Sequence, residues 1–251
     1  MRMAIPLILP LLGLTLAAAL WAVATLLLAA DTPILANFAP LEALRALSGL
    51  AIDPLMWSHI GVSLQRVAIG LVVALAIGVP LGILTGVSRA FAHTTTPVFQ
   101  FLRMISPLSW MPIAVMVLGV GDAPVYFLLA FAAVWPILLN TAAGVAQLDR
   151  NWLMLARSLS ATRSETIFRV VLPGIVAHIL SGVRLAIGII WIILVPAEML
   201  GVSAGLGYFI LDARDRLAYP DLMAAILIIG ALGFALDYAA RWLYQHWLHK
   251  R

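Results

Sequence analysis

The feature that most constrains this chain is a series of apolar runs long enough to cross a lipid bilayer. A helix rises about 1.5 Å per residue, so roughly 20 apolar residues span the ~30 Å hydrocarbon core. Of the 251 residues, 64% are hydrophobic and only 10% are charged, which a soluble domain would not tolerate on its surface. We therefore predict an all-α, polytopic membrane protein with a single domain, residues 1–251. Its six transmembrane helices are expected at 4–30, 57–86, 98–119, 125–145, 174–200 and 222–244.

The first apolar run has an alternative interpretation, and the second carries a stripe of small residues. Residues 4–30 also resemble a cleaved signal peptide, but the apolar region is too long and Leu28-Ala-Ala is a poor cleavage site, so we favour a retained span. In the second run Gly70, Ala74, Gly78, Gly82 and Gly86 recur every four residues. Small residues at that spacing allow another helix to approach closely.

The stretch from Asp149 to Pro173 does not belong in lipid, because it carries Arg150, Arg157, Arg163 and Arg169. Its first part has an apolar helical face formed by Trp152, Leu155, Ala156 and Leu159, at offsets 0, 3, 4 and 7. Asp149 or Asn151 can cap that helix. Thr162 and Glu165 have the spacing of a capping box for a second short helix, which Pro173 is expected to stop.

The distribution of basic residues predicts the orientation. With both termini in the cytoplasm, the outside receives only Arg45, Arg214 and Arg216, as the positive-inside rule requires. The cytoplasmic side then receives Arg2, Arg89, Arg103, Arg150, Arg157, Arg163, Arg169, Arg241, Lys250 and Arg251. The loop 149–173 is therefore cytoplasmic. Its apolar face needs a protein partner, or alternatively lies in the lipid headgroups.

The third run is interrupted by Ser106-Pro107 and Trp110-Met-Pro112. Prolines remove backbone donors and break a helix, which lipid permits only where protein or a water-filled cavity satisfies the freed carbonyls. We expect a cavity here, with a kink packed inside one subunit as the alternative. The residues expected to border the pathway are Ser106, Pro107, Ser109, Trp110, Pro112, Trp135, Asn140, Trp191 and Glu198.

Ionisable residues inside the spans are expensive and need partners. Arg184 and Asp237 lie about 15 Å from the same membrane face by residue counting, so we predict a structural ion pair. Arg66 and Glu198 both lie near the opposite face and could pair by the same reasoning.

Motifs for catalysis and for metal binding are absent. The sequence has no His-Glu-x-x-His, no Gly-x-Ser-x-Gly and no phosphate-binding Gly-x-x-x-x-Gly-Lys. Its histidines are scattered, so we predict no metal site, and the chain should not hydrolyse ATP itself. Topology explains the excess of basic residues better than nucleic-acid binding does.

Several motifs resemble the permease subunits of binding-protein-dependent ABC importers. Leu155-Ala-Arg-Ser-Leu-Ser-Ala-Thr, followed by Val170-Val-Leu172-Pro173, is similar to their cytoplasmic Glu-Ala-Ala loop. Counting back from Leu172-Pro173, residues 154–156 fall on the Glu-Ala-Ala positions, and Ser160 falls on the position of a glycine. Ile105 to Ile113, Gly182 to Gly188, Ala197 to Leu200 and Gly205 to Tyr208 resemble the branch that handles nitrate, cyanate, bicarbonate, taurine and alkanesulfonates.

The resemblance implies the remaining parts of a transporter. These are a second permease chain in a homodimer, two cytoplasmic ATPase subunits that bind ATP and Mg²⁺, and a periplasmic or lipid-anchored binding protein, all at a bacterial inner membrane. The loop would be the coupling helix between spans 4 and 5. The residues expected to contact the ATPase are Trp152, Met154, Leu155, Ala156, Arg157, Ser158, Leu159, Ser160 and Ala161.

The resemblance also bears on the substrate. The stretch Trp191 to Leu200 looks more like members that handle nitrate, and nitrate or nitrite, cyanate and bicarbonate are favoured over taurine and alkanesulfonates. A carboxylate repels an anion, so Glu198, if it faces the pathway, would gate it or order a neighbouring residue rather than bind the substrate. The competing class is a self-sufficient secondary anion transporter or channel. Such a protein often has repeated halves and coupling-ion groups near mid-membrane, which the sequence does not show.

Overall fold

A computed structural model describes residues 5–30 and 32–249, and these residues are helical apart from turns and short connections. The helices are α1 (Ile5–Ala29), α2 (Pro40–Leu50), α3 (Pro54–Val87), α4 (Arg89–Met104), α5 (Met111–Leu118), α6 (Asp122–Ala146), α7 (Arg150–Ser158), α8 (Arg163–Thr166), α9 (Leu172–Glu198), α10 (Leu206–Asp215) and α11 (Tyr219–His249). Short turns of other helix types are η1 (Pro33–Phe38), η2 (Pro107–Trp110) and η3 (Ile167–Val171).

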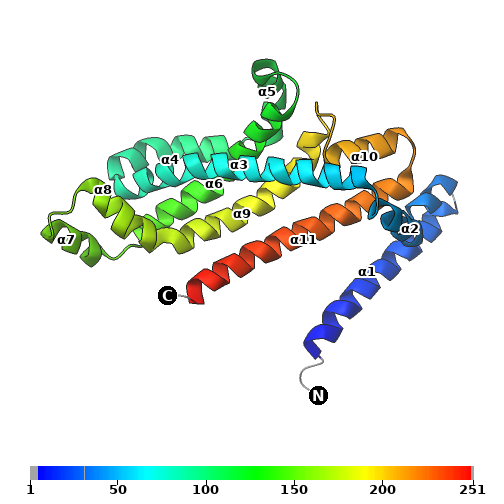
Figure 1. Cartoon of the computed structure of the whole chain (residues 1–251), viewed down its shortest axis with the longest axis horizontal. Coiled ribbons are helices and arrows are strands. Elements are labelled where there is room, and N and C mark those ends of the chain that lie inside the picture. The colour runs from blue at the N-terminus through cyan, green and yellow to red at the C-terminus, as the bar shows by residue number, and fades with distance from the viewer. Residues whose placement is uncertain (1–4, 31, 250–251) are drawn as a thin grey trace.

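The core of the molecule is a bundle in which α6 lies between α3 and α9 (Figure 1). The predicted small-residue stripe of α3 faces α6. A Cβ atom added to Gly82 would lie 2.6 Å from Cβ of Thr141, and one added to Gly86 would lie 2.5 Å from Cβ of Val145. These glycines therefore set the distance between the two helices, as the four-residue spacing predicts.

The number of spans agrees with the sequence. Within the described residues, five helices are long and apolar enough to cross a membrane, and α4 with α5 makes a sixth if the bent pair is one span. α11 packs on α9, α10 and α2, whereas α1 diverges from the bundle (Figure 1). A short helix, α2, lies between the first two spans.

The third span differs from its expected form. The connection holding Arg89 and His93 is helical, so α4 begins at Arg89 and not near Val98. The proline break is confirmed: α4 and the segment Pro107–Leu118 meet at 88°, and α5 projects away from the bundle (Figure 1). Arg103 consequently lies in the last turn of α4 and not beside Arg89 at its start.

The prediction that Pro173 stops a helix is wrong. The chain is helical without interruption from Arg163 to Glu198, and Pro173 lies in the first turn of α9. Directly before it, η3 is a π-helical turn. A π turn bonds i to i+5 and is wider than an α turn. Its position directly before Pro173 suggests how the helix accommodates a residue without an N–H donor.

Candidate functional site

The loop between α6 and α9 forms a helical hairpin at the end of the molecule opposite α10 (Figure 1). Asp149 caps α7 by accepting a hydrogen bond from the backbone N–H of Asn151 at 2.9 Å. The capping box is also present: Glu165 N–H donates to Thr162 Oγ1, and Thr162 N–H donates to the Glu165 carboxylate. The sequence-predicted starts of both helices are therefore confirmed.

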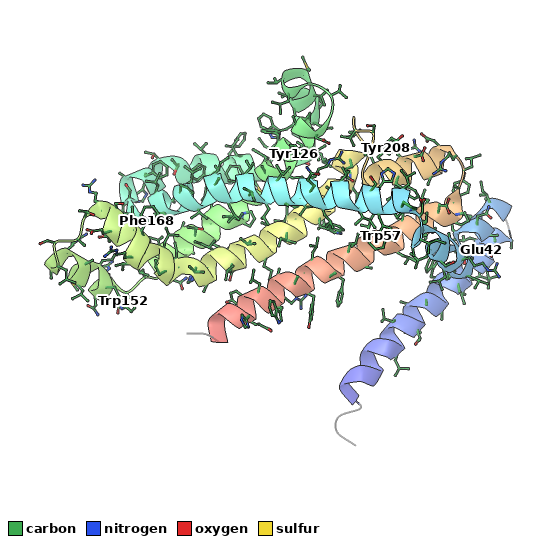
Figure 2. All side chains as sticks on the ribbon, viewed as in Figure 1. Glu42, Trp57, Tyr126, Trp152, Phe168 and Tyr208 are labelled. Atoms are coloured by element: carbon green, nitrogen blue, oxygen red, sulfur yellow. The ribbon has the colours of Figure 1, made fainter. Side chains whose placement is uncertain are left out.

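The apolar face of α7 is divided between the solvent side and the protein side. Trp152, Leu155 and Leu159 are 60%, 62% and 73% exposed, and Figure 2 shows Trp152 at the outer edge of the hairpin. Met154 is exposed as well. Ala156 is only 6% exposed, which corrects its assignment to the contact face. Because the chain itself already buries Ala156, this residue is not available to a partner.

The C-terminal end of α7 comes earlier than Ala161, at Ser158. Ala161 N–H donates to Ala156 C=O at 3.0 Å, and Ser160 N–H donates to Arg157 C=O at 2.9 Å. This pair of bonds is a Schellman motif, whose central residue takes a left-handed conformation usually supplied by glycine. Ser160 occupies that position with φ +54°, which gives a physical reason for the glycine that the resembled loops carry there.

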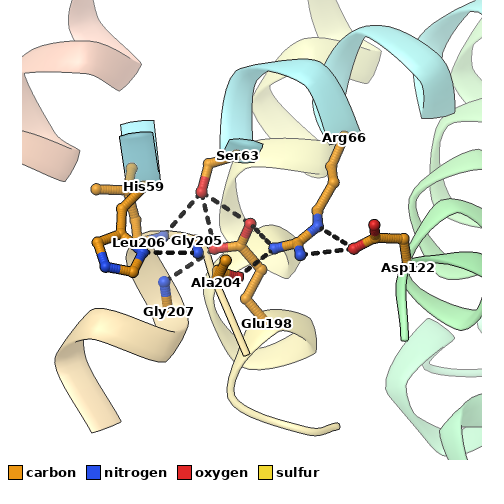
Figure 3. Close-up of polar contacts among 9 residues, drawn as sticks. All are labelled: His59, Ser63, Arg66, Asp122, Glu198, Ala204, Gly205, Leu206 and Gly207. Carbon is orange, nitrogen blue, oxygen red and sulfur yellow. Dashed lines mark hydrogen bonds and ion pairs between the residues drawn. The ribbon is translucent and has the colours of Figure 1, made fainter. Parts of the chain in front are cut away.

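A buried polar network lies at the opposite end of the bundle, where α3, α6, α9 and α10 meet (Figure 3). Arg66 is 2% exposed and Glu198 is fully buried. Arg66 Nη1 donates to Glu198 Oε1 at 2.7 Å, and its Nε and Nη2 donate to Asp122 Oδ1 at 2.9 and 2.6 Å. The expected contact of Arg66 with Glu198 is thus present. Asp122 and Glu198 therefore both accept hydrogen bonds from the Arg66 guanidinium.

The same network holds the start of α10. The first four backbone N–H groups of a helix have no partner within it. Here the Gly205 N–H donates to His59 Nδ1, the Leu206 N–H to Ser63 Oγ, and the Gly207 N–H to Glu198 Oε2. Gly205 has φ +114°, and a Cβ atom there would lie 2.6 Å from Glu198 Oε1. Glycine is therefore required at this position on two counts.

A hollow of about 410 Å³ lies at the helix break. Three of the residues predicted to border the pathway, Pro107, Trp135 and Asn140, line it, and so does Arg103. The other expected pathway residues lie elsewhere. Ser106, Ser109 and Pro112 are exposed outside its lining, Trp110 packs on Phe131, the Trp191 indole N–H donates to Ile229 C=O on α11, and Glu198 is sealed in the network.

Arg184 and Asp237 are in contact, with Arg184 Nε 3.4 Å from Asp237 Oδ1. However, Asp237 bonds mainly to Arg241, one turn further along α11, which donates to it through Nε at 2.7 Å and also through Nη2. The predicted ion pair is therefore present, and its carboxylate is shared with a second arginine. The Arg184 and Asp237 side chains are 41% and 37% exposed.

Sequence reasoning paired Arg66 with Glu198 but did not find the other side chains of the buried network, which are His59, Ser63 and Asp122. His59, Ser63 and Arg66 are spaced by four and three residues, so they share one face of α3, and this polar stripe in an apolar run was a usable signal. Asp122 offered no such signal. It reaches Arg66 because Gly121, at φ +126°, turns the chain into α6 beside α3.

Comparison with known proteins identifies the family. The family described as binding-protein-dependent transport system inner membrane component matches residues 78–249. The bicarbonate transport system permease protein CmpB of Synechococcus elongatus is 41% identical over 77% of this chain and 69% of its own. The taurine transport system permease protein TauC of Escherichia coli is 32% identical over 88% of this chain and 81% of its own.

A nitrate import permease protein, NrtB of Leptolyngbya laminosa, is 36% identical over 79% of this chain and 74% of its own. Among solved structures, the inward-facing MetNI methionine ABC transporter has a chain that aligns with a TM-score of 0.65 at 15% identity, covering 77% of this chain and 98% of that one. At 15% identity, this structural match shows the fold alone.

The fold and these matches define a permease of an ABC importer, a multi-pass protein of the inner membrane. The chain belongs to the family of binding-protein-dependent transport system inner membrane components.

Proposed function

We propose that this chain passes a small anion from a periplasmic or lipid-anchored binding protein to the cytoplasm. The relatives named for bicarbonate and nitrate support a small oxyanion as the substrate. Nitrate or nitrite, cyanate and bicarbonate are our first candidates, and taurine or an alkanesulfonate comes next.

In this proposal the energy comes from partner subunits. Two cytoplasmic ATPase subunits bind ATP and Mg²⁺, and two copies of this permease chain form the path between them. Closure of the ATPase dimer would move α7, and the spans would rock between inward-facing and outward-facing arrangements. The chain itself would supply the path and the mechanical link.

The observation that carries the proposal is the exposed apolar surface of α7. Its residues Trp152, Leu155 and Leu159 are uncovered, while Leu153 packs against the cluster that contains Val145 and Val171. One side of α7 is therefore anchored to α6 and to the helix that continues into α9. Because that helix is unbroken to Glu198, a displacement of α7 would be carried into the spans.

The docking of α7 is tested by Leu155→Asp and Leu159→Asp. A carboxylate in an apolar contact is desolvated without a partner, so we expect uptake in proteoliposomes to fall about tenfold or more, each 1.4 kcal/mol of lost contact being worth a factor of ten. ATP hydrolysis should no longer respond to the loaded binding protein. Asn151→Asp is the matched control, because it adds the same charge to the same exposed helix. Unchanged uptake in both leucine variants would reject docking at this surface.

The energy source and the substrate are tested on the same vesicles. Uptake of labelled bicarbonate, nitrate and taurine is measured with and without ATP and the binding protein. Stoichiometric recovery of an ATPase subunit with the solubilised chain, and uptake that requires ATP, are the expected results. Uptake by the chain alone would favour a self-sufficient secondary transporter or channel.

A further inference from the structure

Arg103 belongs to a polar stripe on α4. Thr96, Gln100 and Arg103 are spaced by four and three residues, so they share one face of the helix. Together with Thr85 of α3 they line a small hollow between α3, α4 and α6. Within the described residues, none of these three α4 side chains makes an ion pair or a hydrogen bond.

The stripe leads into the hollow at the helix break. Arg103, Trp135 and Leu139 line both hollows, so Arg103 lies where the two spaces adjoin. The indole N–H of Trp135 is buried and has no acceptor among the described residues. No Asp or Glu lines either hollow. The region therefore offers hydrogen-bond donors and a cation without a carboxylate.

Arg103 lies far from the Arg89 end of α4, and its side chain is exposed on the surface of this chain. It is 14 residues along α4 from Arg89, or about 21 Å. Trp135 is 11 residues from the end of α6 at Ala146, or about 16 Å. A cation at such a depth is expensive unless it has a partner.

Three other arginines in the long helices are paired. Arg66 contacts Glu198 and Asp122, and Arg184 and Arg241 contact Asp237. Arg103 has no carboxylate within ion-pair distance in the described part of the chain. The described residues therefore supply no counter-charge for it.

We propose that Arg103 binds the transported oxyanion, which supplies that counter-charge during passage. This inference rests on the proposed function and adds a residue that binds the substrate. A guanidinium presents parallel N–H donors that match two oxygens of a planar oxyanion. Gln100 and Thr96 then offer neutral hydrogen-bonding groups along α4 toward Arg89, the end that charge distribution places in the cytoplasm.

The first test is transport by the assembled complex in proteoliposomes. Arg103→Gln should lower the uptake of labelled bicarbonate or nitrate about tenfold or more, since a charge-assisted bidentate contact is lost. Arg103→Lys keeps the charge and should retain part of the uptake. Arg89→Gln removes an arginine from the same helix outside the hollows and should leave uptake unchanged. Wild-type uptake by Arg103→Gln would overturn the proposal.

The second test measures the effect of the Arg103 charge on thiol labelling at the hollows, independently of transport. The chain contains no cysteine, so Leu139→Cys places a single thiol at the junction of the hollows. We expect it to react faster with an anionic thiosulfonate reagent than with a cationic analogue of similar size, after normalisation to a free thiol. Adding Arg103→Gln should lower that rate ratio about tenfold, because one charge within about 8 Å is removed from a medium of intermediate dielectric constant.

The outcomes separate this inference from the proposed function. An unchanged ratio, or no reaction with either reagent, would overturn the role of Arg103 even if wild-type vesicles import an anion. If the ratio falls but wild-type vesicles import none of the tested anions, the substrate class is wrong and the anion site stands. If Arg103→Gln fails to assemble with the ATPase subunit, the labelling ratio measured in membranes decides.

Discussion

Two arginine–carboxylate groups in this chain look alike in sequence and differ in structure. Arg66, Glu198 and Asp122 form one at the α10 end, where Arg66 is 2% exposed and Glu198 is fully buried. Arg184, Asp237 and Arg241 form the other between α9 and α11, where every side chain is more than a third exposed. The first group is also connected to three backbone N–H groups, which donate to Glu198, Ser63 and His59. In the second group, the hydrogen bonds among the described residues run only between its own three side chains.

The difference shows that burial and connectivity decide what an ion pair contributes. A buried pair that loses one partner leaves an uncompensated charge, which costs several kcal/mol. An exposed pair is replaced more easily by other partners and contributes little. The Arg66 group should therefore fix the positions of four helices, and the Arg184 group should only adjust the packing of α11.

The largest effect is expected from Glu198→Gln. This change keeps the volume but removes the charge that faces Arg66, and Asp122 remains as the only carboxylate on the guanidinium. We expect the free energy of unfolding to fall by about 3 kcal/mol, with a Tm in detergent lower by several degrees. Tryptophan fluorescence during heating measures this change.

The matched control for Glu198→Gln is Glu42→Gln. Glu42 also pairs with an arginine, Arg45, but on an exposed helix surface. Its removal should shift Tm very little. Equal shifts in the two variants would show that the buried network does not stabilise the bundle.

A smaller effect is expected from Asp237→Asn. Asp237 pairs with two arginines, and its side chain and theirs are each more than a third exposed. We expect a Tm shift well below that of Glu198→Gln, measured in the same experiment. Replacing Arg184 and Asp237 together by apolar residues of similar size should recover most of it. A larger loss than for Glu198→Gln would indicate that this group is buried in the assembled transporter.

Sequence reasoning reached the parts of the fold that depend on local rules. Apolar run length predicted the spans, the small-residue stripe predicted the contact of α3 with α6, and the spacing of Thr162 and Glu165 predicted the capping box. Depth counting also brought together Arg66 with Glu198 and Arg184 with Asp237. Each of these rules uses only distance along a helix, which the sequence contains directly.

The remaining features depend on what lies across the bundle. Ala156 faces its own chain because of how the hairpin folds back, and helical periodicity alone could not say which edge of the apolar face would be covered. Pro173 has the sequence signature of a helix end, but a π turn precedes it and the helix continues. Arg103 lies near the cytoplasmic start of its span only if that span begins near Val98, as predicted. Its true depth follows from a helix that starts at Arg89.

The smallest effect compares the ends of two helices. α7 and α10 both finish in a Schellman motif with a non-glycine residue in the left-handed region, Ser160 at φ +54° and Leu217 at φ +59°. In both helices, the residue that follows the left-handed one donates its N–H to a carbonyl five residues back, at 3.0 Å in α7 and 2.8 Å in α10. A residue with a Cβ atom costs about 1 kcal/mol in this conformation, and glycine does not.

Ser160→Gly should therefore stabilise the α7 hairpin by about 0.5 kcal/mol, since part of the gain is offset by the greater freedom of glycine in the unfolded chain. The measurement is hydrogen exchange of residues 150–161 in the assembled complex, which should slow about twofold for that energy. Ser158→Gly, two residues earlier and inside α7, is the control, because glycine in a helix destabilises it. Faster exchange in Ser160→Gly would mean that the serine side chain contributes more than its backbone strain costs, and the same change at Leu217 would then test whether that contribution is specific to the hairpin.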